Sequence, residues 1–167
     1  MKTIQQLQRL CKQEKEHFNL KRKHLGQLNT KQLEQNFLET SNKVWACSDC
    51  LKCANCCKTI SPIIEFEDIH NMAKHLAMEA GAFMEKFIEM DEDGDFVFTS
   101  QPCPMLDKTD NKCKVYESRP KACRQYPHLD QVNSKKMLDL AFKNTTYCGV
   151  VFDTIKSLDE CQNIKSL

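Results

Sequence analysis

Apolar side chains recur at helical spacing through the first 43 residues, at Ile4, Leu7, Leu10, Cys11, Phe18, Leu25, Leu33, Phe37 and Leu38. Such spacing is typical of amphipathic helices that bury one face. Between these positions, the stretch from Gly26 to Thr30 offers a glycine that can end one helix and a capping residue that can start the next. The pattern therefore predicts two helices with a break at residues 26 to 30.

A second helical pattern lies between residues 66 and 90. The stripe of a predicted helix from Phe66 to Ala80 consists of Ile69, Met72, Ala73 and Leu76. A shorter helix is predicted from Ala82 to about Met90. The turn-like sequence Asp91–Gly94 precedes a β-branched and aromatic segment at residues 95 to 100, which predicts a strand. Helical spacing returns from Gly149 to Leu158, where we expect a closing helix.

Length, charge and glycine usage exclude several classes of protein. The 167 residues suit one domain with an appendage, and four scattered glycines do not form the loop of a nucleotide-binding motif. The net charge of +1 gives no reason to expect nucleic acid or a membrane as partner. Because no apolar run resembles a membrane span or a signal peptide, we expect a cytoplasmic protein.

Charge is nevertheless unevenly distributed along the chain. Residues 1–43 carry nine Lys or Arg against four Glu, and residues 59–100 carry ten acidic residues against two Lys. The basic cluster at residues 21–24 is interpreted as a solvated helix face, with a docking surface for an acidic protein partner as the alternative.

The 11 cysteines are the main chemical signal. In a reducing cytosol, such a number is better explained by metal ligation than by disulfides. The first cluster comprises Cys47, Cys50, Cys53, Cys56 and Cys57. If this segment is helical, Cys50, Cys53 and Cys57 fall within about 60° of one another. If it is a loop, each Cys-x2-Cys pair can clasp one metal ion.

A second set of cysteines follows on loops stiffened by prolines, at Cys103, Cys113, Cys123 and Cys148. Four plus four thiols suit either two tetrahedral zinc sites or one iron–sulfur cluster, and the spacing does not choose between them. The predicted metal ligands are Cys50, Cys53, Cys56, Cys57, Cys103, Cys113, Cys123 and Cys148. Cys11 and Cys161 are interpreted as small buried hydrophobic residues, and the role of Cys47 stays open.

The first cluster has two alternative interpretations. Its cysteine spacing matches that of a bacterial ferredoxin, but Lys58 replaces the usual proline and no second copy follows. A redox-active disulfide between Cys56 and Cys57 is the other alternative. The clustering of further thiols favours ligation over both.

Three ordered motifs carry a family resemblance: Cys50-Leu-Lys-Cys-Ala-Asn-Cys-Cys57, Cys103-Pro-Met-Leu-Asp107, and Cys113-Lys-Val-Tyr-Glu-Ser-Arg-Pro-Lys-Ala-Cys-Arg-Gln-Tyr-Pro127. In these motifs the chain resembles the CxxCxxCC family of zinc- or iron-chelating domains, the YkgJ-type cysteine-cluster proteins. The resemblance covers roughly residues 47 to 148. It implies a cytosolic domain whose clustered cysteines hold zinc or iron, with a 4Fe–4S cluster as one form. A similar module occurs in flagellin lysine methylases.

Two arginines of these motifs are candidate cofactor-binding residues. Arg119 and Arg124 flank Cys123, and four thiolates around zinc leave a net charge of −2, which guanidinium groups can offset. The alternative is a clamp for an anion or a substrate carboxylate. Tyr116 and Tyr126 are expected to be core rings rather than catalytic acids.

These observations predict a mainly α fold with few short strands. We expect a basic helical N-terminal extension over residues 1–43 and a small, metal-stapled, cysteine-rich domain over residues 44–167. The predicted function is binding of zinc or iron. The alternatives are an iron–sulfur-dependent redox or protein-modifying enzyme, and a metal-stapled adaptor that binds a protein partner through its N-terminal helices. Without metal, residues 47 to 148 are expected to loosen or unfold.

Overall fold

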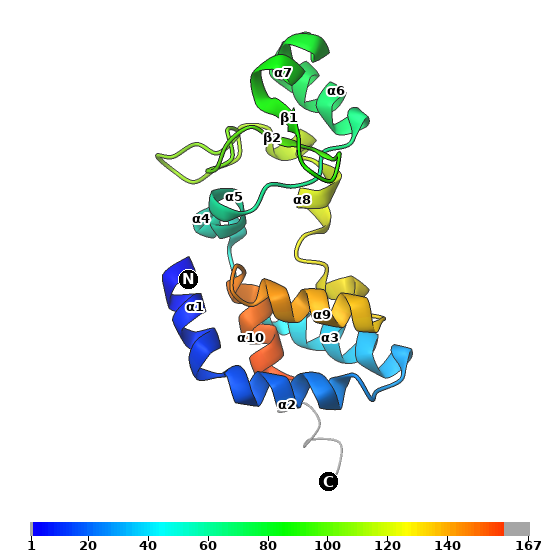
Figure 1. The fold of residues 1–167 in the computed structure, drawn as a ribbon. Helices are drawn as coiled ribbons and strands as arrows, with labels where there is room; N and C mark the ends of the chain where they lie inside the picture. The colour runs from blue at the N-terminus through cyan, green and yellow to red at the C-terminus, as the bar shows by residue number, and fades with distance from the viewer. Residues whose placement is uncertain (1, 159–167) are drawn as a thin grey trace. The chain divides into compact units, whose positions relative to one another are not determined.

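A computed structural model describes residues 2–158 of the chain. The fold class predicted from the sequence is confirmed, because the described part is mainly α-helical and its sheet has two short strands (Figure 1). The chain forms two compact units. Unit 1 comprises Met1–Asp49 and Pro127–Leu167, and unit 2 comprises Cys50–Tyr126. The described residues 127–158 thus belong to the same unit as the N-terminal helices. The division into an N-terminal extension over residues 1–43 and a domain over residues 44–167 stays a prediction.

Unit 1 is a helical assembly with a continuous apolar core. Its helices are α1 (Ile4–Gln13), α2 (Lys15–Leu25), α3 (Thr30–Trp45), the 3-10 helix η2 (Leu129–Gln131), α9 (Lys135–Asn144) and α10 (Gly149–Ser157). Helix α10 packs against α3 and α9. Leu7, Phe37, Val151 and Ile155 are fully buried in this unit. The closing helix predicted from Gly149 to Leu158 is confirmed as α10. The sequence pattern did not predict α9.

Local capping signals set the ends of the first helices. The predicted break after Gly26 is confirmed, since α2 ends at Leu25 and the side chain of Asn29 caps α3 by accepting from Gln32 N. The number of helices was underestimated. An additional break at Glu14, whose φ and ψ are −89° and 6°, divides the first predicted helix into α1 and α2.

The basic cluster at residues 21–24 is only partly solvated. Lys21 is 4% exposed, and its Nζ donates hydrogen bonds to the carbonyl oxygens of Ile155 and Lys156 at 2.8 and 2.9 Å. These carbonyls lie at the C-terminal end of α10, where a cation satisfies unpaired acceptors and interacts favourably with the helix dipole. Arg22 pairs with Asp139 of α9 at 2.9 Å. The cluster therefore joins α2 to α9 and α10, and the prediction of a solvated face is wrong for Lys21.

Unit 2 contains the cysteine motifs and a small core. Its helices are α4 (Cys50–Cys53), α5 (Asn55–Thr59), α6 (Phe66–His75), α7 (Ala80–Phe87), the 3-10 helix η1 (Tyr116–Ser118) and α8 (Lys121–Gln125). Strands β1 (Ile88–Met90) and β2 (Phe96–Phe98) pair antiparallel, with Glu89 opposite Val97. Ile64, Met72, Phe83 and Val115 are buried in its core.

The helices and the strand predicted within residues 66–100 are present, but both helices end earlier in the chain than predicted. The strand at β2 is confirmed. The helix predicted to reach Met90 instead ends at Phe87, because residues 88–90 extend to pair with β2. The helix predicted to reach Ala80 ends at His75, followed by Ala77 at a left-handed φ of 53°.

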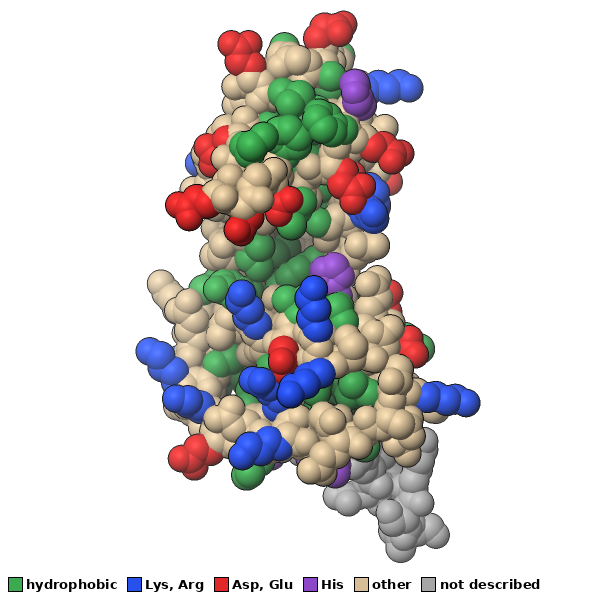
Figure 2. Space-filling model, turned by 45° about the vertical axis from the view of Figure 1, so that its right-hand side comes forward, with side chains coloured by type: hydrophobic (Ala, Val, Ile, Leu, Met, Phe, Trp, Pro, Cys, Tyr) green, Lys and Arg blue, Asp and Glu red, His purple; other side chains and the backbone are tan. Residues whose placement is uncertain are grey.

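Surface charge differs between the two units in the view of Figure 2. On unit 2, carboxylates surround a patch of hydrophobic side chains, and its exposed hydrophobic residues include Ile63, Phe66 and Met90. Lys and Arg side chains predominate on the visible face of unit 1. None of the helices within residues 2–158 combines the length and the apolarity that crossing a membrane requires.

Candidate metal centre

A short hairpin brings two of the predicted ligands together. Cys113 forms an antiparallel bridge with Leu106, three residues after Cys103. On either side of this bridge, Asp107 N donates to Lys112 O and Lys114 N donates to Met105 O, both at 2.8 Å. The backbone from residue 103 to 115 is thereby folded back on itself, with Cys103 and Cys113 on its two arms.

A third cysteine reaches this hairpin from α5. Cys103 N donates a 2.7 Å hydrogen bond to the carbonyl oxygen of Cys57, which ties the hairpin to the first cysteine cluster. The sulfur of Cys57 lies 4.0 Å from that of Cys56. The hydrogen bond with Cys56 raises the pKa of the Cys57 thiol well above its ordinary value, and burial and the charge of Cys56 act in the same direction.

Cys123 on α8 completes a group of four. Burial, followed by the charges of Cys57, Cys103 and Cys113, raises the pKa of Cys123 to about 12. Charge effects of this kind weaken with distance between the groups. We call Cys57, Cys103, Cys113 and Cys123 the four-thiol set. Its members come from α5, the two arms of the hairpin and α8.

Backbone N–H groups already point at two of these sulfurs. Burial raises the pKa of Cys103 to about 12, while hydrogen bonds from the N–H groups of Met105 and Leu106 act in the opposite direction. Burial likewise raises the pKa of Cys113, and the N–H of Val115 opposes it. N–H donors that face sulfur stabilise the thiolate form, which is the form that binds metal.

The remaining predicted ligands are divided between the units. Cys50 and Cys53 lie on α4 and Cys56 lies on α5, in unit 2. Cys148 is a buried residue that precedes the first residue of α10, in unit 1. The exposed Cys47 is also assigned to unit 1.

The first cysteine cluster is neither one helix nor an open loop. Helices α4 and α5 are separated by Ala54, which adopts left-handed backbone geometry with φ 49° and ψ 21°. This reversal breaks the helical periodicity that would have aligned Cys50, Cys53 and Cys57 on one face. Cys53 and Cys57 are therefore presented by different helices.

Cys11 and Cys161 are not among the predicted ligands. Cys11 donates from Sγ to Thr145 Oγ1 at 3.4 Å, and burial raises its pKa. These contacts agree with a thiol that packs in unit 1. Cys161 lies outside the described residues.

Ligand geometry is incomplete within residues 2–158. No three Cys, His, Asp or Glu side chains in this range are already arranged around one position for a metal ion. The cysteines in this range are thiols rather than disulfides. A metal ion at the four-thiol set would therefore require these side chains to rearrange.

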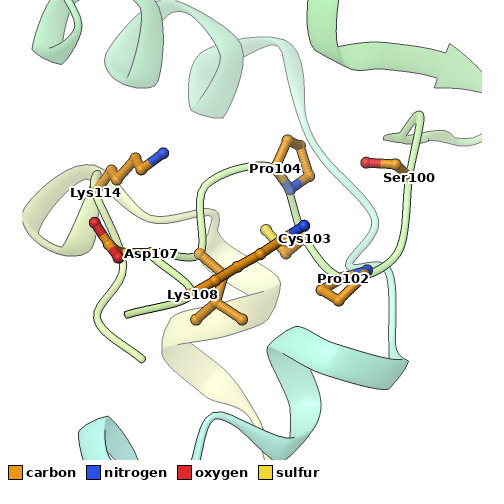
Figure 3. Close-up of a pocket in the computed structure, with 8 residues that line it drawn as sticks. Ser100, Pro102, Cys103, Pro104, Asp107, Lys108 and Lys114 are labelled. Atoms are coloured by element: carbon orange, nitrogen blue, oxygen red, sulfur yellow. The ribbon is translucent and has the colours of Figure 1, made fainter. Parts of the chain in front are cut away.

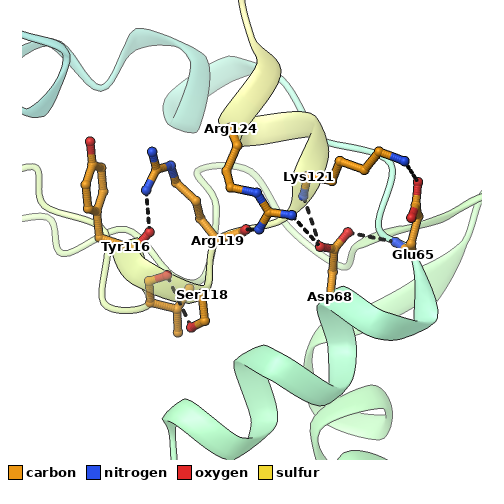
Figure 4. A network of polar contacts seen from close by, with 8 residues as sticks. Glu65, Asp68, Tyr116, Ser118, Arg119, Lys121 and Arg124 are labelled. Atoms are coloured by element: carbon orange, nitrogen blue, oxygen red, sulfur yellow. Dashed lines mark hydrogen bonds and ion pairs between the residues drawn. The ribbon is translucent and has the colours of Figure 1, made fainter.

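Arg119 lies beside the four-thiol set. Its guanidinium group opposes the rise in the pKa of both Cys113 and Cys123. The group is held in place because it stacks 4.0 Å from the centre of the Tyr116 ring and Nη1 donates to Tyr116 O at 2.6 Å (Figure 4). Tyr116 is 38% exposed, so the expectation that it is a core ring is wrong.

Arg124 has different partners. Its Nη1 donates to the carbonyl oxygen of Arg119, and its Nη2 lies 3.8 Å from Asp68 Oδ1 (Figure 4). The Asp68 carboxylate is buried and also accepts from the backbone N–H groups of Lys121 and Glu65 at 3.0 and 3.1 Å. Asp68 thus caps the start of α8, which carries Cys123, and the start of its own helix α6. Sequence reasoning counted Asp68 only as part of an acidic segment.

We expect Asp68→Ala to destabilise unit 2 by about 2–3 kcal/mol, because it removes two backbone caps and leaves Arg124 without its carboxylate. Chemical denaturation of the metal-loaded protein measures this loss. The matched control is Asp110→Ala, which removes an exposed carboxylate bound to Lys112 at 3.0 Å. If Asp110→Ala lost as much free energy of unfolding as Asp68→Ala, that result would contradict the role assigned to Asp68.

A hollow of about 390 Å³ opens beside Cys103 (Figure 3). The prolines on either side of this cysteine, Pro102 and Pro104, form part of its wall. Lys108 and Lys114 contribute ammonium groups to the lining, and Asp107 contributes a carboxylate. The hollow gives solvent and small molecules an approach to the segment that carries Cys103.

Clustered thiols with backbone N–H donors and a nearby guanidinium group are the chemistry expected of a cysteine-cluster metal-binding module. The chain belongs to the CxxCxxCC family, whose model, described as "Putative zinc- or iron-chelating domain", matches residues 49–149. The matched range contains all eight predicted ligands. The chain therefore contains a domain of the family that is described as chelating zinc or iron.

One relative extends this comparison. The chain is similar to the uncharacterized protein MJ0661 of Methanocaldococcus jannaschii, with 29% identity over 90 residues. The similar region covers 53% of this chain and 48% of the relative, so the chain spans about half of that protein. No solved structure matches the chain.

Proposed function

We propose that the four-thiol set, Cys57, Cys103, Cys113 and Cys123, holds the zinc or iron centre of this protein. The observation that carries the proposal is the backbone arrangement of unit 2, in which Cys103 N donates to Cys57 O at 2.7 Å and the hairpin pairs Cys113 with Leu106. The charge of Cys57 also contributes to the raised pKa values of Cys103, Cys113 and Cys123. Four thiolates match the coordination number of a structural zinc site or the ligand number of an iron–sulfur cluster.

Arg119 is proposed to neutralise part of the charge of the centre. Four thiolates around a divalent ion leave about two excess negative charges, and a guanidinium group can offset one of them through hydrogen bonds. Arg124 is proposed to act indirectly, because it bonds to Arg119 O and Asp68 rather than to a thiol. In this proposal Arg119 tunes the centre and Arg124 positions α8.

Chemical analysis of the purified protein determines which metal it binds. Soft thiolate ligands accept zinc and iron–sulfur clusters alike, so availability in the cell decides between them. We also propose a cytoplasmic location, since reduced thiols persist in a reducing compartment. Metal and acid-labile sulfide should be measured, with a visible spectrum, on protein purified without oxygen. Brown protein with iron and sulfide supports a 4Fe–4S centre. Colourless protein with stoichiometric zinc supports a tetrahedral zinc site, and protein without either metal contradicts the proposal.

Metal binding is expected to release protons. Because the pKa values of Cys57, Cys103, Cys113 and Cys123 are all raised, these thiols are protonated at neutral pH in the metal-free protein. Zinc binding at pH 7 should therefore release about four protons, and its apparent affinity should fall as the pH is lowered. Titration calorimetry in two buffers that differ in ionisation enthalpy measures the release. Binding without proton release would contradict ligation by these thiols.

A second function, an iron–sulfur-dependent redox or protein-modifying reaction, is favoured by the hollow beside Cys103. A catalytic centre needs an open approach for its substrate, whereas a structural zinc site is closed. Lys108 and Lys114 would suit a substrate that carries an anionic group. This function requires iron, so a protein that contains only zinc would exclude it.

An adaptor role for the N-terminal helices is the third candidate. Truncation is a poor test, because α3 packs against α10 and its removal would expose the core of unit 1. Charge reversal at the exposed Lys23 is preferable, since it leaves the buried Lys21 in place. Binding of an acidic protein partner should weaken in Lys23→Glu if these helices form the docking surface.

A further inference from the structure

We infer that an apolar patch on unit 2, surrounded by carboxylates, binds a basic amphipathic segment of a protein partner. The apolar patch consists of the exposed side chains of Ile63, Phe66 and Met90 and the half-buried ring of Phe96. This surface is separate from the N-terminal helices, which belong to unit 1.

The pairing of β1 with β2 brings Met90 beside Phe96. These two residues lie opposite each other, and directly beyond them Asp91 N donates to Asp95 O at 2.9 Å. Hydrogen-bonded and non-hydrogen-bonded pairs alternate along an antiparallel ladder, so Met90 and Phe96 form a non-hydrogen-bonded pair. The side chains of such a pair lie close together on one face of the sheet.

The start of α6 supplies the rest of the apolar patch. The ring of Phe66 meets that of Phe96 edge to face, with the ring centroids 5.0 Å apart. Ile64 N donates to Phe96 O at 2.8 Å, so the segment that leads into α6 runs beside β2. The side chain of Ile64 is buried, whereas that of its neighbour Ile63 is 54% exposed.

The side chains of the apolar patch are more exposed than packing within unit 2 requires. Phe66 is 61% exposed and Met90 is 64% exposed. Contiguous apolar surface that is rimmed by polar groups marks interaction sites on soluble proteins. Phenylalanine and methionine are also enriched at protein interfaces, and the unbranched methionine side chain adapts to the shape of a partner.

Carboxylates flank these side chains along the chain. Glu67 follows Phe66, Glu89 precedes Met90 and Asp91 follows it, and all three carboxylates are exposed. Figure 2 shows acidic side chains around the hydrophobic surface of unit 2. The potential beside the apolar patch is therefore negative.

The acidic character extends beyond the immediate neighbours of the patch. Residues 59–100 carry ten acidic residues against two Lys. The Asp91 carboxylate is held at the turn between the strands, because its Oδ1 accepts from the N–H groups of Asp93 and Asp95 at 3.0 and 2.9 Å. A fixed carboxylate loses little conformational entropy when it meets a cation.

Charge complementarity selects the occupant. An acidic rim attracts Lys and Arg and repels an acidic partner, while the apolar centre needs apolar side chains next to those cations. A helix with one apolar and one basic face meets both requirements. A stable dimer interface uses about 20–30 residues on each side, so three exposed apolar side chains suit a short segment better than a second copy of this chain.

Fluorescence anisotropy of a labelled helical peptide tests the inference. The probe is a synthetic amphipathic helix of about four turns, built from leucine on one face and lysine on the other. It is titrated with the full chain as purified without oxygen. We expect saturable binding that weakens as salt is added, and no binding of the same peptide with glutamate in place of lysine.

The double variant Phe66→Ala/Met90→Ala should weaken this binding at least about tenfold, because it removes the two most exposed apolar side chains of the patch. The matched control is Leu20→Ala/Leu38→Ala, which removes two exposed apolar side chains from unit 1 and should bind as the unmodified chain does. Circular dichroism verifies that each variant is folded.

A second variant tests the rim and leaves the apolar side chains in place. Glu67→Gln/Glu89→Gln should bind the lysine peptide more weakly at low salt and with a smaller dependence on salt, since rim charges act through long-range attraction. This variant keeps the inference testable if the apolar substitutions prevent folding.

Three results would overturn the inference. The unmodified chain could fail to bind the lysine peptide or bind both peptides equally. The patch and rim variants could bind as tightly as the unmodified chain. Sedimentation could also show a dimer that Phe66→Ala/Met90→Ala abolishes, which would make a second copy of this chain the occupant of the apolar patch.

Discussion

Replacement of Cys57 by serine is expected to remove the metal from the purified protein. Cys57 O accepts from Cys103 N at 2.7 Å, and after burial the charge of Cys57 contributes to the raised pKa values of Cys103, Cys113 and Cys123. A serine hydroxyl has almost the same size but does not replace a soft thiolate as a ligand. We expect the affinity for zinc to fall by more than about 100-fold, since even the loss of a residue that supports a ligand costs 10- to 100-fold.

Metal content, measured by mass spectrometry after gel filtration, checks this result. Cys11→Ser is the control, because it makes the same chemical change in unit 1, where Cys11 bonds to Thr145. The control should retain full metal content. Stoichiometric metal in Cys57→Ser would remove Cys57 from the proposed ligand set.

Chelation of the metal is expected to unfold unit 2 while unit 1 stays folded. Structural zinc contributes on the order of 10–16 kcal/mol in small peptides, which is comparable with or larger than the stability of an ordinary domain. Unit 2 has a small core, and the proposed ligands come from distant parts of its sequence. Unit 1 contains none of the four-thiol set and has its own buried core.

Hydrogen exchange of backbone amides before and after chelation measures this difference. The amides of Asp107 and Lys114, which close the hairpin, should lose protection. The amide of Phe152 in α10 should retain it, and it serves as the internal reference. Unchanged protection throughout residues 50–126 after complete metal removal would show that the fold of unit 2 does not depend on metal.

Sequence reasoning succeeded where local signals determine structure. The break after Gly26 follows from one glycine and the capping residue Asn29, and α10 follows from helical spacing alone. It failed where partners distant in sequence decide the outcome. Residues 88–90 are extended because β2 pairs with them, and Lys21 is buried because the end of α10 needs a donor.

The same distinction applies to the candidate site. The order of the cysteine motifs indicated a metal-binding domain, and the family comparison agrees. The grouping of Cys57 with the hairpin depends on a backbone hydrogen bond from Cys103 and on the left-handed Ala54. Alanine carries no signal for that conformation, whereas a glycine would have suggested it. The role of Asp68 depends on α8, which lies about 50 residues further along the chain.

The hairpin also has a consequence for the order in which the protein assembles. Cys103, Cys113 and Cys123 follow one another at intervals of ten residues, whereas Cys57 precedes Cys103 by 46. Short loops close at a lower entropic cost than long ones, and contacts between nearby residues form early. A metal ion that is captured first by the hairpin and α8 would then bring in Cys57 last and close the longest loop. Metal capture and chain collapse would in that case be successive stages of one folding pathway.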